Sequence, residues 1–222
     1  MMQIKILYED NHLLVVVKPP NIPVQGDISG DLDLLTLLKD DIKIRYNKPG
    51  NVFLGLVHRL DRPVGGVMIF AKTSKAASRL SEQIREHEMG KIYLCVVQGC
   101  PENLKGRLDD HLLKDTKVNV VSVVEPGTPG SKQAILDYEV IGRTEGISLI
   151  KVNLLTGRSH QIRVQMANNG TPLFGDSKYG HPGNKEHQLA LWSYELSVFH
   201  PVTKERMTFT SSPPDQYPWN LF

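Results

Sequence analysis

The chain has little that would mark a metal site, a disulfide framework or a membrane segment. It carries only two cysteines, Cys95 and Cys100, spaced C-x4-C, whereas a structural zinc site needs about four ligands at closer spacing. Its eight histidines show neither an H-x3-H nor an HExxH spacing. The uninterrupted apolar runs, such as Leu13–Val17, are far shorter than the roughly 20 residues that span a bilayer. We therefore expect no bound metal, reduced thiols and no membrane association.

The chain also lacks a strong excess of one charge and any nucleotide-binding motif. Its formal net charge is +2, so overall electrostatics gives no clear sign of a nucleic-acid partner. Residues 51–100 carry seven Lys/Arg against four Asp/Glu, and 151–222 carry seven against five, which predicts a modest basic surface if they meet. Neither G-x4-GK[ST] nor G-x-G-x-x-G after a strand occurs, and no signal peptide is evident. We expect no nucleotide cofactor and a cytoplasmic protein.

What the chain does contain is a series of strand patterns that arrive mostly in pairs. Helical periodicity predicts helices over 32–45, 74–87 and 159–168, the second capped by Ser74 and the third ended by Gly170. Strands are expected at 4–8, 13–18, 67–71, 91–98, 133–141, 147–154, 188–198 and 206–211, with hairpins or an excursion over 101–130. Paired strands favour an α+β fold with a mixed, largely antiparallel sheet in one domain over 1–222.

The stretch GLVHRLDRPVGGVMIFAK places Asp61 between Arg59 and Arg62. One interpretation is a solvated surface loop whose charges cancel. The alternative is a carboxylate held beside fixed positive charge, because the proline and glycines that follow permit a tight turn into the buried strand 67–71. An irregular loop tethered to a rigid strand is a common location for catalytic groups.

A second dense stretch, LLTGRSHQIRVQMANNGTPLFGDSKYG, spans residues 154–180. A helix starting near Ser159 would present backbone N–H groups to an anion, and Arg158 and Arg163 add positive charge. Ser159 and Arg163 would share a helix face because they are four residues apart. The alternative is a capped amphipathic helix with a solvated arginine, and spacing alone does not decide between the two.

Tyr93 lies in the strand pattern GKIYLCVV and also allows two interpretations. It can fill the core or serve as a platform on which a base stacks. Ile92 and Leu94 alternate with it, and we expect their face of the strand to be the more deeply buried one.

Taken together, these stretches resemble the pseudouridine synthases of the ribosomal large-subunit (RluA-type) family. The similarity rests on HRLDRPVGGVMIFAK at 58–72, KIYLCVVQG at 91–99 and the 154–180 stretch, with YEDNHLLVVVKPPNIPVQ at 8–25 as a first motif. It implies isomerisation of uridine to pseudouridine in rRNA or tRNA without a cofactor. It also implies a mixed, largely antiparallel sheet with helices packed on it and a central active-site cleft. We expect a monomeric catalytic domain without a separate N-terminal RNA-binding module.

The resemblance assigns roles motif by motif. It implies that Asp61 is the catalytic aspartate, that Arg163 pairs with it, and that Tyr93 packs on the target base. Arg59 would fill the gap left by the flipped nucleotide, and Ile162 would form part of the apolar pocket wall. Arg62 and Arg158 are further candidates for RNA contacts.

One departure from the family pattern and two alternative functions stay open. Gly65 replaces a hydroxyl residue that many relatives carry after HRLD, which removes no catalytic group. The chain could be an inactive RNA-binding module of the same fold, although Asp61, Tyr93 and Arg163 are all present. It could instead be a carboxylate-dependent hydrolase, which would need a second carboxylate such as Asp176.

Overall fold

The computed structural model describes residues 4–180 and 187–222, which form two compact units. Unit 1 comprises Met1–Gly90 and Ser193–Ser212, and unit 2 comprises Lys91–Trp192 and Pro213–Phe222. Each unit is described separately. That both units belong to a single catalytic domain over 1–222 stays a prediction.

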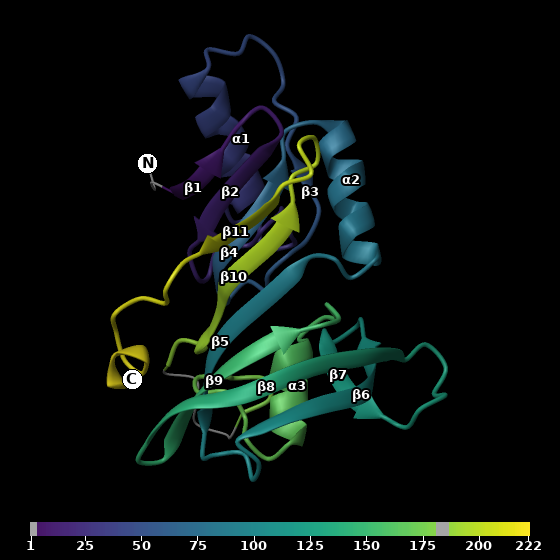
Figure 1. Cartoon of the computed structure of the whole chain (residues 1–222), viewed down its shortest axis with the longest axis vertical. Coiled ribbons are helices and arrows are strands. Elements are labelled where there is room, and N and C mark those ends of the chain that lie inside the picture. The colour runs from purple at the N-terminus through teal and green to yellow at the C-terminus, as the bar shows by residue number, and fades with distance from the viewer. Residues whose placement is uncertain (1–3, 181–186) are drawn as a thin grey trace. The chain divides into compact units, whose positions relative to one another are not determined.

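Unit 1 contains six strands and two helices (Figure 1). The strand order is β1-β2-β4-β10, with β3 pairing β4 and β11 pairing β10. Its elements are β1 (Lys5–Glu9), β2 (Leu13–Lys18), α1 (Leu34–Arg45), β3 (Gly55–Leu56), β4 (Gly65–Ala71), α2 (Ser74–Arg85), β10 (Leu191–Phe199) and β11 (Arg206–Thr210). The predicted strand 13–18 is therefore confirmed to the residue.

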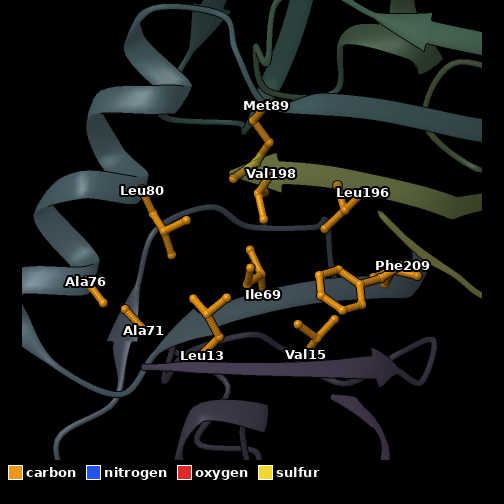
Figure 2. Close-up of a cluster of buried hydrophobic side chains, with 11 residues drawn as sticks. Leu13, Val15, Ile69, Ala71, Ala76, Leu80, Met89, Leu196, Val198 and Phe209 are labelled. Carbon is orange, nitrogen blue, oxygen red and sulfur yellow. The ribbon is translucent and has the colours of Figure 1, made fainter. Parts of the chain in front are cut away.

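The core of unit 1 lies between α2 and the sheet. Figure 2 shows side chains from β2, β4, α2, β10 and β11 meeting there, among them Leu13, Ile69, Leu80, Leu196 and Phe209. Every residue of β4 is buried, because the strand is central in its sheet. β4 thus gives the preceding loop a rigid end.

The start of α2 corrects one sequence expectation. Thr73, not Ser74, is the N-cap, and its hydroxyl accepts a hydrogen bond from the Ala76 backbone N–H at 3.1 Å. Both residue types cap well. Strand β4 ends at Ala71 and thereby fixes where the chain turns. This turn places the Thr73 hydroxyl, rather than that of Ser74, at the start of the helix.

Unit 2 contains antiparallel strands in the order β5-β9-β8-β6-β7 and one short α-helix. Its elements are β5 (Gly90–Gln98), β6 (Lys105–Asp115), β7 (Val120–Val124), β8 (Lys132–Thr144), β9 (Ile147–Leu154), α3 (Gln161–Asn168) and a 3-10 turn, η2 (Trp219–Leu221). Of the two alternatives for 101–130, hairpins or an excursion, the β6–β7 pair confirms a hairpin. With the antiparallel pairs of unit 1, this gives the expected α+β class.

Helix α3 differs from the amphipathic helix that periodicity suggested. It starts at Gln161, so Ser159 lies in the preceding turn and shares no helix face with Arg163. Its residues from Gln161 to Met166 are all buried, because one side packs with Val164 against Leu112, Val121 and Ala134 and the rest is also covered. The predicted end is confirmed, since Gly170 has a φ of 79° just beyond the helix.

Within the part of the chain that the structure describes, no helix is long and apolar enough to cross a membrane.

Gly66 supplies a test of how tightly the Asp61 loop enters β4. Its φ is 116°, and a Cβ there would lie 2.2 Å from the Ser193 carbonyl oxygen. We expect Gly66→Ala to lower the free energy of unfolding by about 2–4 kcal/mol, because it adds a clash to an unfavourable φ. Chemical denaturation measures this. In the control Gly50→Ala, no atom lies within 4 Å of the new Cβ, so stability should stay equal or rise by up to about 1 kcal/mol. Equal effects of the two changes would contradict the prediction.

Candidate active site

Asp61 lies in the loop that connects β3 to β4 in unit 1, and the loop is held at both ends. Asp61 itself is partly buried. Its carbonyl oxygen accepts a hydrogen bond from the Val64 N–H at 3.0 Å, which closes a turn over 61–64. Upstream, the His58 Nε2 accepts one from the Ile69 N–H at 3.1 Å, so this imidazole nitrogen carries no proton. The carboxylate therefore extends from a backbone anchored on β4.

Lys18, at the end of β2, binds the backbone of the same loop. Its side chain is fully buried, and Nζ donates to the carbonyl oxygens of Pro19, Arg62 and Val64 at 2.9, 2.9 and 2.8 Å. Burial lowers the pKa of this ammonium to about 7, against the opposing effect of the Asp61 charge. An ammonium has three N–H donors, so these three carbonyls satisfy it fully.

The two arginines beside Asp61 have different surroundings. Arg59 is exposed. The Arg62 guanidinium instead reaches back to the loop between β2 and α1, donating to the Asn21 carbonyl, the Ser29 hydroxyl and the Asp31 carboxylate. Arg62 thus ties two loops together, and its expected contact with RNA stays a prediction.

Tyr93 occupies the inner face of β5 in unit 2, contrary to expectation. It is only 7% exposed, whereas Ile92 and Leu94 on the other face are partly exposed. Tyr93 pairs with Val152, itself fully buried, in register on β9. The prediction about which face is more buried was therefore wrong, because β9 presents its apolar residues on the side of Tyr93.

Arg163, on α3, forms a buried ion pair with Asp176 in unit 2. Its Nε donates to Oδ2 at 2.8 Å and its Nη2 to Oδ1 at 2.7 Å, a bidentate arrangement. Arg163 is 5% exposed and Asp176 is inaccessible, so the alternative of a solvated arginine was wrong. Burial alone would raise the pKa of Asp176, but the hydrogen bonds and charge of Arg163 outweigh it and hold that pKa below its ordinary value. Asp176 is therefore ionised at neutral pH.

The loop 175–180 adds further support to this ion pair. Asp176 Oδ1 also accepts the backbone N–H groups of Lys178 and Tyr179 at 2.9 and 3.1 Å. The Arg163 Cζ lies 5.2 Å from the centre of the Tyr179 ring. The Tyr179 hydroxyl accepts from the Val121 N–H at 2.9 Å and lies 2.6 Å from His160 Nδ1. Loop 175–180 is thus joined both to the start of α3 and to β7.

The turn before α3 is organised by Gln161. Its side-chain oxygen accepts from the Thr156 hydroxyl at 2.8 Å and from the Arg158 N–H at 3.0 Å. The Arg158 side chain is exposed, and its Nε donates to the Gln133 carbonyl at 2.9 Å. Ile162 is buried on α3, as an apolar wall residue would be.

The described residues contain no group of three or more His, Cys, Asp or Glu side chains that could hold a metal ion. Cys95 is buried in β5, and burial raises the pKa of its thiol. Cys100 is exposed.

The structure brings Arg163, Ile162 and Arg158 together around α3, with Tyr93 in the same unit. Asp61 belongs to unit 1, so its pairing with Arg163 stays a prediction. Sequence reasoning missed Lys18, and it considered Asp176 only for a hydrolase. The available signal for Lys18 was a charged residue that directly follows the apolar run 13–17. For Asp176 it was an aspartate placed between Gly175 and a turn.

Comparison with known proteins agrees with the antiparallel fold and the order of the motifs. The profile of the family described as RNA pseudouridylate synthase matches residues 12–168. The chain belongs to this family, a class of RNA-modifying isomerases, and within it to the RluA type.

Named relatives support that placement. The dual-specificity RNA pseudouridine synthase RluA of Haemophilus influenzae is 34% identical, over 93% of this chain and 91% of its own length. The ribosomal large subunit pseudouridine synthase D of Zymomonas mobilis is 32% identical, over 95% of this chain and 69% of its own length. An RNA pseudouridine synthase of Bacillus subtilis, YhcT, is 32% identical, and the chain spans 66% of its length.

A solved human protein, RNA pseudouridylate synthase domain containing 4, has the same fold. It superposes with a TM-score of 0.80 at 22% identity, over 95% of this chain and 88% of that one.

The ion pair on α3 predicts a large and specific loss of stability. We expect Asp176→Asn to lower the free energy of unfolding by about 3–5 kcal/mol at neutral pH, because it removes the charge of the carboxylate that a buried guanidinium binds in a bidentate pair. The wild-type advantage should be fully present above about pH 4 and shrink as the pH falls further, since the pKa of Asp176 is lowered in the folded state. Urea denaturation between pH 2.5 and 7 measures both effects. The control is Asp137→Asn, at the exposed Arg107–Asp137 pair, where little change is expected.

Lys18 predicts a dependence on alkaline pH. Its folded pKa, about 7, lies below that of an unfolded lysine, so the unfolded chain binds more protons between pH 7 and about 10.5. The free energy of unfolding of wild type should therefore rise over this range relative to Lys18→Met, by up to about 1.4 kcal/mol per pH unit. Hydrogen exchange of the Val64 amide should be faster in the variant, because the loop loses its support.

The control Lys48→Met removes an exposed lysine of the same unit. It should follow wild type in both measurements. A Lys18→Met curve parallel to wild type would show that the buried ammonium does not titrate as described.

Proposed function

We propose that the chain isomerises specific uridines in structured RNA to pseudouridine, using Asp61 as an ionised catalytic carboxylate. The observation that carries this proposal is the family match over 12–168, which includes Asp61, Tyr93 and Arg163. The relatives that match along most of the chain are named as RNA pseudouridine synthases.

The reaction is an isomerisation: the ribose C1′ exchanges one ring atom of the base for another, and the composition of the nucleotide does not change. The C1′–N1 bond breaks, a C1′–C5 bond forms, C5 gives up a proton and N1 gains one. A carboxylate can promote this by adding covalently, or by removing a proton from the sugar in a glycal-type route. Both roles require an ionised Asp61, and the anchored loop 57–64 keeps its backbone fixed while the ring reorients.

Arg163 is proposed to supply the positive charge that keeps Asp61 ionised. A guanidinium has five N–H donors in a fixed plane, and the bidentate pair with Asp176 engages two of them. That pair is therefore compatible with a second carboxylate on the same cation. The electrostatic reason is that an opposite charge nearby favours the charged form of a carboxylate.

Tyr93 is proposed to stack on the uracil ring once the nucleotide has left its helix. Extracting a base costs a few kcal/mol, and stacking on an aromatic side chain returns about 1–3 kcal/mol. A buried, strand-anchored ring loses little entropy in this role. Ile162 would add apolar contact, and Arg59, which is exposed, would occupy the place that the nucleotide vacates.

The names of relatives, and not a binding groove in the structure, support the substrate class. Some act by name on the large ribosomal subunit, and one is named dual-specificity. We propose rRNA as the main substrate and tRNA as a second one, bound through phosphate contacts and RNA shape. The cytoplasmic location and the monomeric state belong to the same proposal.

The proposal is tested by Asp61→Asn. We expect this variant to form no detectable pseudouridine while RNA affinity stays within a few-fold of wild type, because the change removes one charge and almost no volume. Sequencing-based mapping of pseudouridine in rRNA and tRNA, with purified enzyme and unmodified transcripts, measures turnover. Filter binding measures affinity.

The control is Asp40→Asn in the same unit, which removes an exposed carboxylate on α1 and should keep turnover. Full turnover by Asp61→Asn would refute the catalytic assignment. If wild type binds RNA but forms no pseudouridine on either RNA, the chain is an inactive binding module of this family.

A further inference from the structure

Lys91 begins the inner face of β5, two residues before Tyr93, and its ammonium lies against a backbone without a side chain. A Cβ built on Gly157 would lie 3.6 Å from Lys91 Nζ. Because side chains two apart on a strand point to the same side, Lys91 and Tyr93 share a face of β5. The ammonium therefore lies beside Gly157, in the turn that precedes α3, and its residue shares a strand face with the proposed base platform.

The Arg158 guanidinium acts on this ammonium with a charge of the same sign. Burial lowers the pKa of Lys91, and the Arg158 guanidinium lowers it further. Within residues 4–180 and 187–222, neither Lys91 nor Arg158 has a carboxylate partner. Two neighbouring cations without an anion repel each other, and the half-buried one has also lost part of its hydration.

Arg158 is nevertheless fixed in place. Its Nε donates to the Gln133 carbonyl at 2.9 Å and its backbone N–H to the Gln161 side-chain oxygen at 3.0 Å. These contacts hold the guanidinium near Lys91 and leave its two terminal nitrogens as further donors. The repulsion is thus built into the folded turn.

We propose that Lys91, Gly157 and Arg158 form a binding site for an RNA phosphate, next to the base platform at Tyr93. A phosphate between the two cations would replace repulsion by two attractions, with Lys91 as a point charge and Arg158 as a planar fork. Glycine at 157 lets the phosphate oxygens approach the backbone closely. Two residues of a strand span about 7 Å, within reach of the backbone of a nucleotide whose base stacks on Tyr93.

The site rests on the proposed function, since it assigns a phosphate of the same RNA. It adds a contact that fixes the register of the strand at the target nucleotide, because phosphate contacts position a nucleic acid without reading its sequence. Lys91 is thereby a substrate-binding residue and takes no part in bond breaking.

The test is the salt dependence of RNA binding by Lys91→Gln. The probe is a fluorescein-labelled, unmodified RNA hairpin with uridines in its loop, and fluorescence anisotropy gives the affinity between 50 and 300 mM KCl. We expect binding at low salt to weaken several-fold, and the slope of log affinity against log salt to fall by about 0.7–1, the effect of one phosphate contact. Lys91→Arg should restore most of the slope.

Lys151→Gln is the matched control. Lys151 lies on the neighbouring strand β9, opposite Leu94 and thus on the other face, where its charge acts on Glu139. Its removal should leave the slope close to that of wild type. Thermal unfolding of Lys91→Gln adds a second readout: stability should be equal or higher, because repulsion with Arg158 is removed. A slope equal to wild type, or a loss of stability that accounts for weaker binding, would overturn the proposal.

A failure of the phosphate site can be distinguished from a failure of the proposed function. If wild type forms pseudouridine and the slope of Lys91→Gln is unchanged, only the phosphate site fails. If the slope falls but wild type forms no pseudouridine, the phosphate site stands and the catalytic proposal fails.

Discussion

The constraint on which both units depend is that a cation removed from water must have its donors satisfied by the protein. In unit 2 the Arg163 guanidinium is buried and held by Asp176, and in unit 1 the Lys18 ammonium is buried beneath three carbonyl oxygens. Leaving such a charge unpaired costs several kcal/mol. Each buried cation therefore fixes the conformation of the loop that supplies its acceptors, and these loops carry or adjoin the residues proposed for catalysis.

This constraint explains how irregular segments can hold chemistry in place. The turn over 61–64 has no sheet ladder of its own, yet its carbonyls converge on Lys18. Loop 175–180 likewise wraps its N–H groups around Asp176. Preorganised groups need little rearrangement when charge develops during reaction. Lys91 and Arg158 are the contrasting case, since two cations lie together with no carboxylate partner in the described chain.

Much of the fold could be predicted because local patterns and tertiary packing agree. The apolar run Leu13–Val17 sits in β2, and the polar segment 101–130 contains the β6–β7 hairpin. The errors occur where a partner element decides. Thr73 takes the cap in place of Ser74, and Tyr93, rather than Ile92 and Leu94, lies on the more buried face of β5, where it faces the apolar residues of β9. Helix α3 is buried on almost every side, so the spacing of its apolar residues could not show which face packs against the sheet.

The sequence alone determined the class of fold, the order of the motifs and the identity of the candidate residues, because these depend on residue type and spacing. It identified Asp61, Tyr93 and Arg163 without their surroundings. Only the tertiary structure decided that Arg163 is bound by Asp176, 13 residues away, and that Lys18 supports a loop 44–46 residues downstream. Hydrogen-bond partners of buried charges are chosen by which backbone and side-chain atoms converge in space, and separation along the chain does not encode that convergence.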